Sequence, residues 1–281
     1  MLAPSPFFSG FTPAAHRGAS REFPENTLDA FRRAQEILPG CLVETDVHMT
    51  RDGCIVIAHD DLLENKTDAT GTISTRTGAE IARADAGFAI TFDGGRTFPF
   101  RGRGFRMPLL ADALAAFPTA RFSVDIKDND PEAADRTMAV IREQGALSRI
   151  IVGSFHEAVV KRVRRMHPDA ITCFSKREII RFVALQKLCL PAPARWRGAA
   201  LLVPEIAAGR SYEFIGRWAT GGVRVITRCF IREAHRRGVP VLAWTINRPD
   251  NMRRLIAWGV DGIVTDRIDL LKNVMAEARP A

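Results

Sequence analysis

The segment "VETDVHMTRDGCIVIAHD", residues 43–60, places acidic residues and two histidines inside runs that otherwise have the composition of β-strands. Alternate side chains of a strand point to the same face, so Glu44 and Asp46 share one face and the apolar residues beside them share the other. An Asp-Gly pair at 52–53 is a strong hairpin signal. If that pair forms the whole turn, His59 lies directly opposite Asp46 and joins the two carboxylates.

Polar or aromatic side chains also stand at the ends of other predicted strands. In "RFSVDIKD", strand parity turns Asp125 and Lys127 to one face, away from the apolar residues that alternate with them. The remaining candidates are His16 and Arg17 after the first apolar run, and either Trp244 or Asn247 in "VLAWTIN". Parallel barrels carry their chemistry at the C-terminal ends of the strands, so we expect these side chains to meet there.

Three converging carboxylates, those of Glu44, Asp46 and Asp125, require a cation, because unpaired buried carboxylates are costly and tend to protonate. Their all-oxygen donor set suits one hard divalent ion, Mg²⁺ or Ca²⁺, better than zinc. With Arg17 and Lys127 beside them, the expected ligand is a phosphate that bridges the metal and the two cationic side chains.

Two histidines complete the predicted site. Imidazole titrates near neutral pH, so His16 and His59 can supply the general acid and the general base of a hydrolysis. Taken singly, a glutamate in a strand is most often a solvated residue, and a lone histidine is most often a satisfied core or loop residue. The combination with the carboxylates favours a site that processes a phosphate.

The elements that must position these residues follow the pattern of an α/β fold with a parallel sheet, since short apolar runs alternate with amphipathic stretches. Strands are predicted near residues 12–16, 42–47, 55–59, 121–126, 150–154, 171–174, 199–203, 223–227, 240–246 and 262–265. Helices are predicted at 26–38, 110–117, 131–144, 156–167, 177–189, 228–237, 249–258 and 267–278. Asn26 or Thr27 is available as the N-cap of the first helix. The whole pattern predicts a single (β/α)8 TIM-barrel domain spanning residues 1–281.

Ten strand runs are two more than a barrel of eight needs. The hairpin accounts for one, because it makes the run at 55–59 a return strand rather than a barrel strand. The second surplus run lies between residues 199 and 227, and the sequence leaves open which run there closes the barrel. Residues 61–107, rich in Gly and Thr with one short helix near "GAEIARADAG", form an insertion after the second barrel strand and its hairpin that we expect near the active site.

Composition narrows the class of protein: 281 residues, 46% apolar and 26% charged, describe an ordinary globular chain. The net charge of +8 is scattered over helices and favours anions, from phosphate to a membrane surface with peripheral contact, and no nucleic-acid motif accompanies it. No apolar run approaches the roughly 20 residues of a membrane span. The oligomeric state is left open.

The compartment is predicted from two features of the chain. The N-terminus lacks a basic region and a continuous apolar region, so we expect no cleaved signal peptide. The cysteines show no metal-ligand spacing and are odd in number, which indicates reduced thiols: Cys41, Cys54, Cys173, Cys189 and Cys229. A cytoplasmic protein is expected.

Five segments, taken together, resemble the glycerophosphodiester phosphodiesterases. They are "AHRGASREFPENTLDAF", "VETDVHMTRDGCIVIAHD", "SVDIK", "GSF" and "VPVLAWTINRPDNMRRLIAWGVDGIVTD", in the family's order across residues 14–266. The resemblance implies a (β/α)8 barrel of the phosphatidylinositol-phospholipase-C-like superfamily, one divalent metal, and hydrolysis of a glycerophosphodiester to glycerol 3-phosphate and an alcohol.

The resemblance also implies roles for individual residues. His16 and His59 would be the acid and base pair. The metal would be held by Glu44, Asp46 and Asp125. The substrate would be bound by Arg17 and Lys127 at the phosphate, by Glu25 and Asn26 shaping the pocket near the glycerol end, and by Trp244 packing on the glycerol. The resemblance leaves open which histidine acts first and whether water or a substrate hydroxyl attacks phosphorus.

Three departures from the family pattern stand out. Asp125 occupies a position where the family commonly has glutamate, so its carboxylate is one methylene shorter; aspartate there is also found in the related sphingomyelinase D and lysophospholipase D branch. "MPLLADAL" replaces the usual P-T-L-E-E, and "TDRID" lacks the usual proline after T-D; neither difference bears on the inferred chemistry.

The insertion carries phenylalanines and arginines that admit two interpretations: Phe88, Phe92, Phe98, Phe100 and Phe105, with Arg96, Arg101, Arg103 and Arg106. They either form an apolar, anion-attracting mouth that accepts an acyl chain beside a phosphate, or make up a small satellite core under a lid.

Three functions therefore stand. The first is metal-dependent hydrolysis of glycerophosphodiesters. The second keeps the site but takes lysophospholipids, releasing lysophosphatidic acid and a headgroup. The third is a non-catalytic barrel that binds phosphates or acidic surfaces, although every position of the inferred catalytic set holds a chemically competent residue.

Overall fold

Eight parallel strands form the centre of the computed structural model, which describes residues 7–188, 196–207 and 223–277. They are β1 (Thr12–His16), β2 (Leu42–Met49), β4 (Phe122–Ile126), β5 (Ile150–Gly153), β6 (Ile171–Thr172), β7 (Leu201–Pro204), β10 (Val241–Trp244) and β11 (Gly262–Thr265). Neighbouring strands pair in the order β6-β5-β4-β2-β1-β11-β10-β7, and a parallel bridge between Cys173 and Ala200 joins the two ends. The sheet closes on itself, which confirms the predicted barrel.

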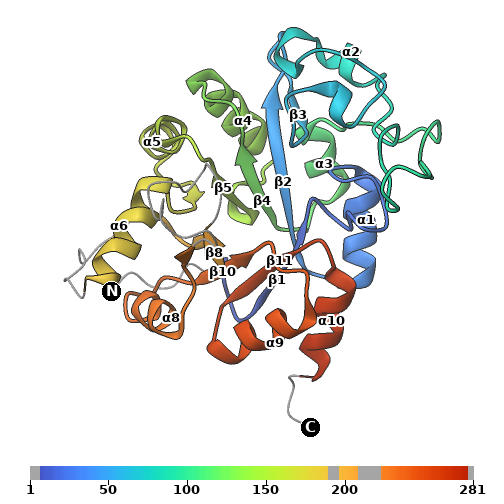
Figure 1. The fold of residues 1–281 in the computed structure, drawn as a ribbon. Helices are drawn as coiled ribbons and strands as arrows, with labels where there is room; N and C mark the ends of the chain where they lie inside the picture. The colour runs from blue at the N-terminus through green and yellow to red at the C-terminus, as the bar shows by residue number, and fades with distance from the viewer. Residues whose placement is uncertain (1–6, 189–195, 208–222, 278–281) are drawn as a thin grey trace.

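Helices surround these strands (Figure 1). They are α1 (Leu28–Ile37), α3 (Leu110–Ala116), α4 (Pro131–Glu143), α5 (Glu157–Met166), α6 (Lys176–Lys187), α8 (Arg228–His235), α9 (Pro249–Trp258) and α10 (Ile268–Glu277). In α1, the Thr27 side chain accepts the Ala30 N–H as N-cap, and Phe31, Ala34 and Ile37 are buried at helical spacing. The eight predicted helices are confirmed in their described parts; the predicted last residues 189 and 278 lie outside the described residues.

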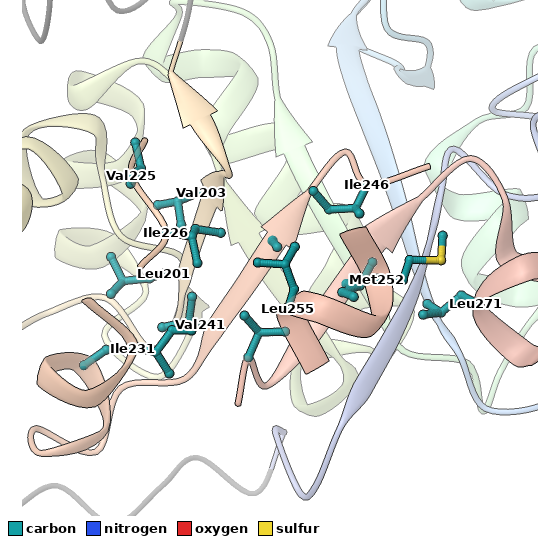
Figure 2. Packing of buried hydrophobic residues seen from close by; sticks show 14 of the residues in the cluster. Leu201, Val203, Val225, Ile226, Ile231, Val241, Ile246, Met252, Leu255 and Leu271 are labelled. Carbon is teal, nitrogen blue, oxygen red and sulfur yellow. The ribbon is translucent and has the colours of Figure 1, made fainter. Parts of the chain in front are cut away.

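The main apolar core lies between the strands and the helices that cover them. Figure 2 shows Leu201 and Val241, from adjacent strands, packed with Ile231 of α8 and Leu255 of α9. Each buried side chain of this size contributes about 1.5–3 kcal/mol by leaving water. The outward face of the barrel is therefore the apolar one, and the inward face near the strand ends is left for polar residues.

The β2–β3 hairpin has a different register from the one predicted. β3 (Ile55–Ile57) pairs with β2 so that Val47 lies opposite Ile57, and the Ala58 N–H donates to the carbonyl oxygen of Asp46. A two-residue turn, with His59 directly opposite Asp46, is therefore wrong. The loop contains three residues between Thr50 and Cys54, with Gly53 at a φ of 81°, and this longer loop shifts the pairing by one residue.

The second surplus run also finds its place. The run at 199–203 provides β7, whereas Val223–Arg224 forms β9, which pairs antiparallel with β8 (Ile206–Ala207) outside the barrel. Val225 and Ile226, which follow β9, are buried in the core that contains α8. The apolar character of this run therefore reflects packing against a helix rather than pairing in the barrel.

Residues 61–107 contain three short helical elements, η1 (Leu63–Asn65), η2 (Ile73–Thr75) and α2 (Gly78–Ile81). Leu63, Ile73 and Ile81 pack with Val56 and Ala58 in a separate aliphatic cluster. The segment thus has a small core of its own, joined to the barrel through the hairpin. The short helix expected near "GAEIARADAG" is α2.

Two further observations bear on the predictions. Among the described helices, none combines the length and the apolar content needed to cross a bilayer. Cys41, Cys54, Cys173 and Cys229 are free thiols, and Cys189 lies outside the described residues.

Candidate active site

A cavity of about 240 Å³ lies at the C-terminal ends of the barrel strands. Its lining includes eight of the ten predicted site residues: His16, Arg17, Glu44, Asp46, His59, Asp125, Lys127 and Trp244. The other two, Glu25 and Asn26, line an adjoining hollow together with His59. The structure therefore brings the predicted set together at the end of the barrel where barrel enzymes keep their chemistry.

Strand register accounts for much of this convergence. His16 pairs with Glu44 across β1 and β2, and Asp46 pairs with Asp125 across β2 and β4. Side chains at paired positions of parallel neighbours stand side by side on the same face. His59 arrives differently, because β3 ends at Ile57 and the chain beyond it leaves the regular ladder.

His16 is held by an aspartate that sequence reasoning missed. Its Nδ1 lies 2.6 Å from Oδ1 of Asp266, and its Nε2 lies 3.8 Å from Oε2 of Glu44. Burial disfavours the imidazolium, but the hydrogen bond that His16 donates to Asp266 and the charge of Glu44 outweigh it, so the pKa of His16 is raised above 6.5. His16 is therefore poised to carry a proton.

Asp266 is fixed in turn by Asn247. The Asn247 amide donates to Oδ2 of Asp266 at 2.6 Å, and its carbonyl oxygen accepts the Asp266 N–H at 2.9 Å. Of the two candidates in "VLAWTIN", Trp244 lines the cavity, whereas Asn247 binds Asp266. Asp266 directly follows β11, as Arg17 follows β1 and Lys127 follows β4, so its place at a strand end was a signal in the sequence.

His59 has the opposite electrostatic setting. Its Nδ1 lies 2.7 Å from Oδ1 of Asp60. Burial and the neighbouring charge of Arg17 nevertheless lower the pKa of His59 below 6.5, against the attraction of Asp46 and Asp60. The ring is therefore biased toward the neutral form, which can accept a proton.

His48, to which the sequence assigned no role, supports the backbone at His59. Its Nδ1 lies 2.7 Å from Oδ1 of Asp128 and its Nε2 lies 3.2 Å from the carbonyl oxygen of His59. Oδ2 of Asp128 also accepts the Met49 N–H at 2.6 Å. The end of β2, the segment after β4 and the chain at His59 are thus tied through one imidazole.

Asp46 stands at the centre of the charged part of the cavity. The Lys127 ammonium lies 2.8 Å from its Oδ1, Arg17 Nε lies 3.3 Å from its Oδ2, and the Asn26 amide donates to Oδ2 at 3.1 Å. Burial alone would raise its pKa, but the two cations outweigh that cost and lower it. Lys127 also donates to Asp125 at 2.6 Å, so its ammonium bridges two carboxylates.

Glu25 and Asn26 line the hollow beside the cavity and contact Arg17 and Asp46. Arg17 donates to Oε1 of Glu25 at 3.0 Å. Asn26 is 4% exposed, and its amide oxygen accepts the Thr45 hydroxyl at 2.8 Å while its amino group donates to Asp46. Both polar ends of Asn26 are therefore used inside the protein.

Glu44 is the least compensated carboxylate of the three. Among described residues, its ion pair is with His16 at 3.8 Å, while the Arg17 backbone N–H donates to it at 3.3 Å. Burial and the charge of Asp46 raise the pKa of Glu44 to about 7. In the present conformation, no three carboxylate, imidazole or thiol groups within the described residues are arranged to hold a metal ion.

The other half of the cavity is mainly apolar, although Lys176 of α6 also lines it. Phe155 meets Trp244 edge to face with ring centroids 6.1 Å apart. Phe174, Ile179 and Leu202 also line this side. The cavity is therefore divided, with charged groups from β1, β2 and β4 facing an apolar wall from the later strands and α6.

The fold matches those of solved proteins along nearly the whole chain. A glycerophosphoryl diester phosphodiesterase domain from Mycobacterium tuberculosis aligns with a TM-score of 0.78 at 20% identity, covering 96% of this chain and 100% of that one. An Oleispira antarctica phosphodiesterase, solved with sn-glycerol-3-phosphate, aligns with a TM-score of 0.72 at 21% identity, covering 95% and 97%. These likenesses place the chain among (β/α)8 barrels.

Sequence comparison defines the family. The model of the glycerophosphoryl diester phosphodiesterase family matches residues 16–270. A probable glycerophosphodiester phosphodiesterase of M. tuberculosis is 34% identical over 93% of this chain and 89% of its own length. A human lysophospholipase D is 24% identical over 93% of this chain and 85% of its own length. The chain belongs to the glycerophosphoryl diester phosphodiesterase family.

Proposed function

We propose that the protein hydrolyses glycerophosphodiesters to glycerol 3-phosphate and an alcohol, as one catalytic domain that includes the insertion at 61–107. The observation that carries this proposal is the pair His16 and His59, which face one cavity with pKa values shifted in opposite directions from 6.5. Two titratable groups whose pKa values are shifted apart by their surroundings are typical of an acid and base pair. The name and bound product of the O. antarctica phosphodiesterase support the same substrate class.

In the proposed reaction, the oxygen of the attacking hydroxyl bonds to phosphorus while neutral His59 accepts the proton of that hydroxyl. The bond from phosphorus to the alcohol oxygen breaks, and protonated His16 donates its proton to that oxygen. Asp266 accepts a hydrogen bond from His16 and so favours the protonated imidazolium before the reaction. If the attacking hydroxyl belongs to water, this step gives glycerol 3-phosphate directly. If it belongs to the glycerol of the substrate, the step gives a cyclic phosphate, which water opens in a second step with the two histidines exchanging roles.

Arg17 and Lys127 are proposed to bind the phosphate. Both line the cavity, and both are held close to Asp46, with Arg17 additionally held by Glu25. Their positive charges would stabilise the negative charge that grows on the phosphoryl oxygens during attack. Trp244, at the boundary with the apolar wall, would pack on the glycerol carbons.

We also propose one divalent cation, Mg²⁺ or Ca²⁺, held by Glu44, Asp46 and Asp125. The donor chemistry fits, because the set offers only oxygens and Glu44 carries a charge that nearby cations do not fully balance. Lys127 bridges Asp46 and Asp125 here, so the ammonium must move aside for all three carboxylates to share an ion. When bound, such an ion would polarise the phosphoryl oxygens.

The apolar wall favours a second candidate, the hydrolysis of lysophospholipids. Phe155, Phe174 and Leu202 line the same cavity as the two histidines, so an alkyl chain and a phosphodiester could be held together. The human relative that is named a lysophospholipase D supports this substrate class. The chemistry at phosphorus would be the same in both cases.

Product analysis with purified protein tests the proposal. Incubation with glycerophosphocholine and Mg²⁺ or Ca²⁺ is expected to release choline and glycerol 3-phosphate, and incubation with lysophosphatidylcholine to release choline and lysophosphatidic acid if the second candidate holds. Loss of a general acid or base slows a reaction by roughly 10²- to 10⁴-fold, so the hydrolysis rates of His16→Ala and His59→Ala should fall by that factor. Inertness toward both substrates would favour a non-catalytic barrel that binds phosphates or acidic surfaces.

A further inference from the structure

A cluster of phenylalanine rings lies beside the active-site cavity without being buried. It comprises Phe23 of the β1–α1 segment with Phe92, Phe100 and Phe105 of the insertion, whose rings contact one another, and Phe98, which lies two residues before Phe100 in the chain; it is called here the aromatic surface. Phe100 stacks on Phe23 with centroids 5.9 Å apart and meets Phe105 and Phe92 edge to face at 5.2 and 5.9 Å. Phe92 is 44% exposed, and the other four rings are half-buried.

The buried core of the insertion is made by other residues. Leu63, Ile73 and Ile81 of the aliphatic cluster are 2%, 0% and 1% exposed. A satellite core therefore exists, but the phenylalanines are not part of it. Rings that remain in contact with water next to a complete core indicate a surface with a partner rather than a failed core.

Four arginines lie in residues 91–106, the segment that carries most rings of the aromatic surface. Arg101 is used internally, because its guanidinium lies 4.2 Å from the centroid of Phe88 and 4.0 Å from that of Phe98. Arg96, Arg103 and Arg106 are exposed, and none of them forms an ion pair with a residue that the structure describes. Residues 91–106 hold four arginines and one aspartate, so their net charge is 4 − 1 = +3.

The segment that carries Phe92 projects from the edge of the molecule (Figure 1). Figure 1 shows the teal chain between α2 and α3 reaching out as a loop at the edge of the molecule. Gly94 and Gly102 of this loop have no neighbouring side chain or backbone within 4 Å of a Cβ placed on them. Phe92 lines a hollow together with Asp266, and Asp266 holds His16 on its other side, so one residue separates the loop from the candidate active site.

We propose that the aromatic surface and the arginines Arg96, Arg103 and Arg106 bind an anionic membrane surface. Aromatic rings enter the region of lipid headgroups, and arginines contact lipid phosphates and are attracted by the negative surface potential. The rings fit this partner better than single-stranded nucleic acid, which needs open ring faces for base stacking. Here the faces of Phe88 and Phe98 are covered by Arg101, and Phe100 is enclosed by three other rings.

Vesicle flotation with the full chain tests the proposal without any catalytic readout, so the result does not depend on the proposed hydrolysis. The probes are vesicles of phosphatidylcholine alone and of an equimolar mixture of phosphatidylcholine and phosphatidylglycerol. The wild type is expected to float with the anionic vesicles, and the floating fraction should fall as salt is raised. It is expected not to float with vesicles of phosphatidylcholine alone. The triple variant Phe92→Ser/Arg96→Ser/Arg103→Ser should have a lower partition coefficient for the anionic vesicles. The loss of each arginine should lower this coefficient roughly fivefold.

The matched control is Arg165→Ser/Met166→Ser, which removes an exposed arginine and a methionine that is 50% exposed at the end of α5. This variant should float like the wild type, and circular dichroism should show that both variants fold. Equal flotation of the triple variant and the wild type would overturn the proposal. So would an absence of wild-type binding to anionic vesicles, or binding to polyuridylate that the triple variant loses while its vesicle binding is unchanged.

Discussion

At the scale of single residues, the two histidines divide the proposed chemistry because their surroundings differ. Asp266 and Glu44 raise the pKa of His16 above 6.5 despite its burial, whereas burial and Arg17 lower the pKa of His59 below 6.5. The same residue type is thus biased toward the acid in one place and toward the base in the other.

This division predicts a bell-shaped dependence of kcat/KM on pH. Activity should fall as the pH drops through the pKa of His59, which must be neutral, and fall again as the pH rises through the pKa of His16, which must be protonated. The plateau is therefore expected to include pH 6.5. A rate that rises steadily through this region, measured by choline release from glycerophosphocholine, would be incompatible with the assignment.

Asp266→Asn should move one limb of that profile. The amide cannot supply the charge that favours the imidazolium, so the pKa of His16 should fall and the alkaline limb should shift to lower pH, while the acid limb stays in place. Asp261→Asn is the matched control, since Asp261 contacts His235 at 2.8 Å away from the cavity. An unchanged alkaline limb in Asp266→Asn would separate Asp266 from the function of His16.

At the scale of elements, the turn after β1 sets the position of His16 and Arg17 relative to α1. Gly18 has a φ of 82°, and a Cβ placed there would lie 2.7 Å from the carbonyl carbon of Ala30. Gly40 has a similar φ of 79° with open space around it. Both glycines have the left-handed conformation. Only Gly18 also lies close to the backbone of another segment, and this close approach distinguishes it from Gly40.

Replacing each glycine by alanine separates these two costs. Gly40→Ala should lower the free energy of unfolding by about 1–2 kcal/mol, the cost of a left-handed alanine. Gly18→Ala should lower it by about 2–4 kcal/mol, because overpacking against Ala30 adds to that cost. Urea unfolding of both variants measures the difference, and equal losses would mean that α1 moves away without penalty.

The elements themselves were largely predictable, and the exceptions have physical causes. Strand and helix periodicity located every barrel strand, because burial on one or both faces leaves a strong pattern. The hairpin register was wrong by one residue, since an Asp-Gly pair fits both a two-residue loop and a three-residue loop with Gly53 at its end. The run at 223–227 was ambiguous because Val225 and Ile226 are buried against α8, which gives the same apolar signal as a barrel strand.

At the scale of the whole molecule, the barrel gathers side chains that are up to 250 residues apart in the sequence. Strand parity and the ends of strands predicted the carboxylates and Lys127, because those signals are local. Asp266 and the link from His48 through Asp128 depend on which strand ends are neighbours, which the sequence does not specify residue by residue. Support for the predicted residues was therefore harder to foresee than the residues themselves.

The balance of charge in the cavity predicts how a divalent cation should act on the whole protein. Because the pKa of Glu44 is raised to about 7, its carboxylate is ionised above that pH and protonated below it. Mg²⁺ or Ca²⁺ should therefore raise Tm more above pH 7 than below it, and Glu44→Gln should remove most of this pH dependence. Thermal unfolding in EDTA and in each cation measures the effect; a shift that is the same in Glu44→Gln would place the ion elsewhere.

The central claim is that His16 and His59 hydrolyse a glycerophosphodiester in this cavity. Phosphorus NMR of glycerophosphocholine incubated with the protein and Mg²⁺ or Ca²⁺ tests it most directly, because substrate and product give separate signals. We predict conversion to glycerol 3-phosphate by the wild type, roughly 10²- to 10⁴-fold slower conversion by His16→Ala and His59→Ala, and little change in Asp261→Asn. Conversion at the wild-type rate by both histidine variants, or a substrate signal that stays unchanged with the wild type, would contradict the account.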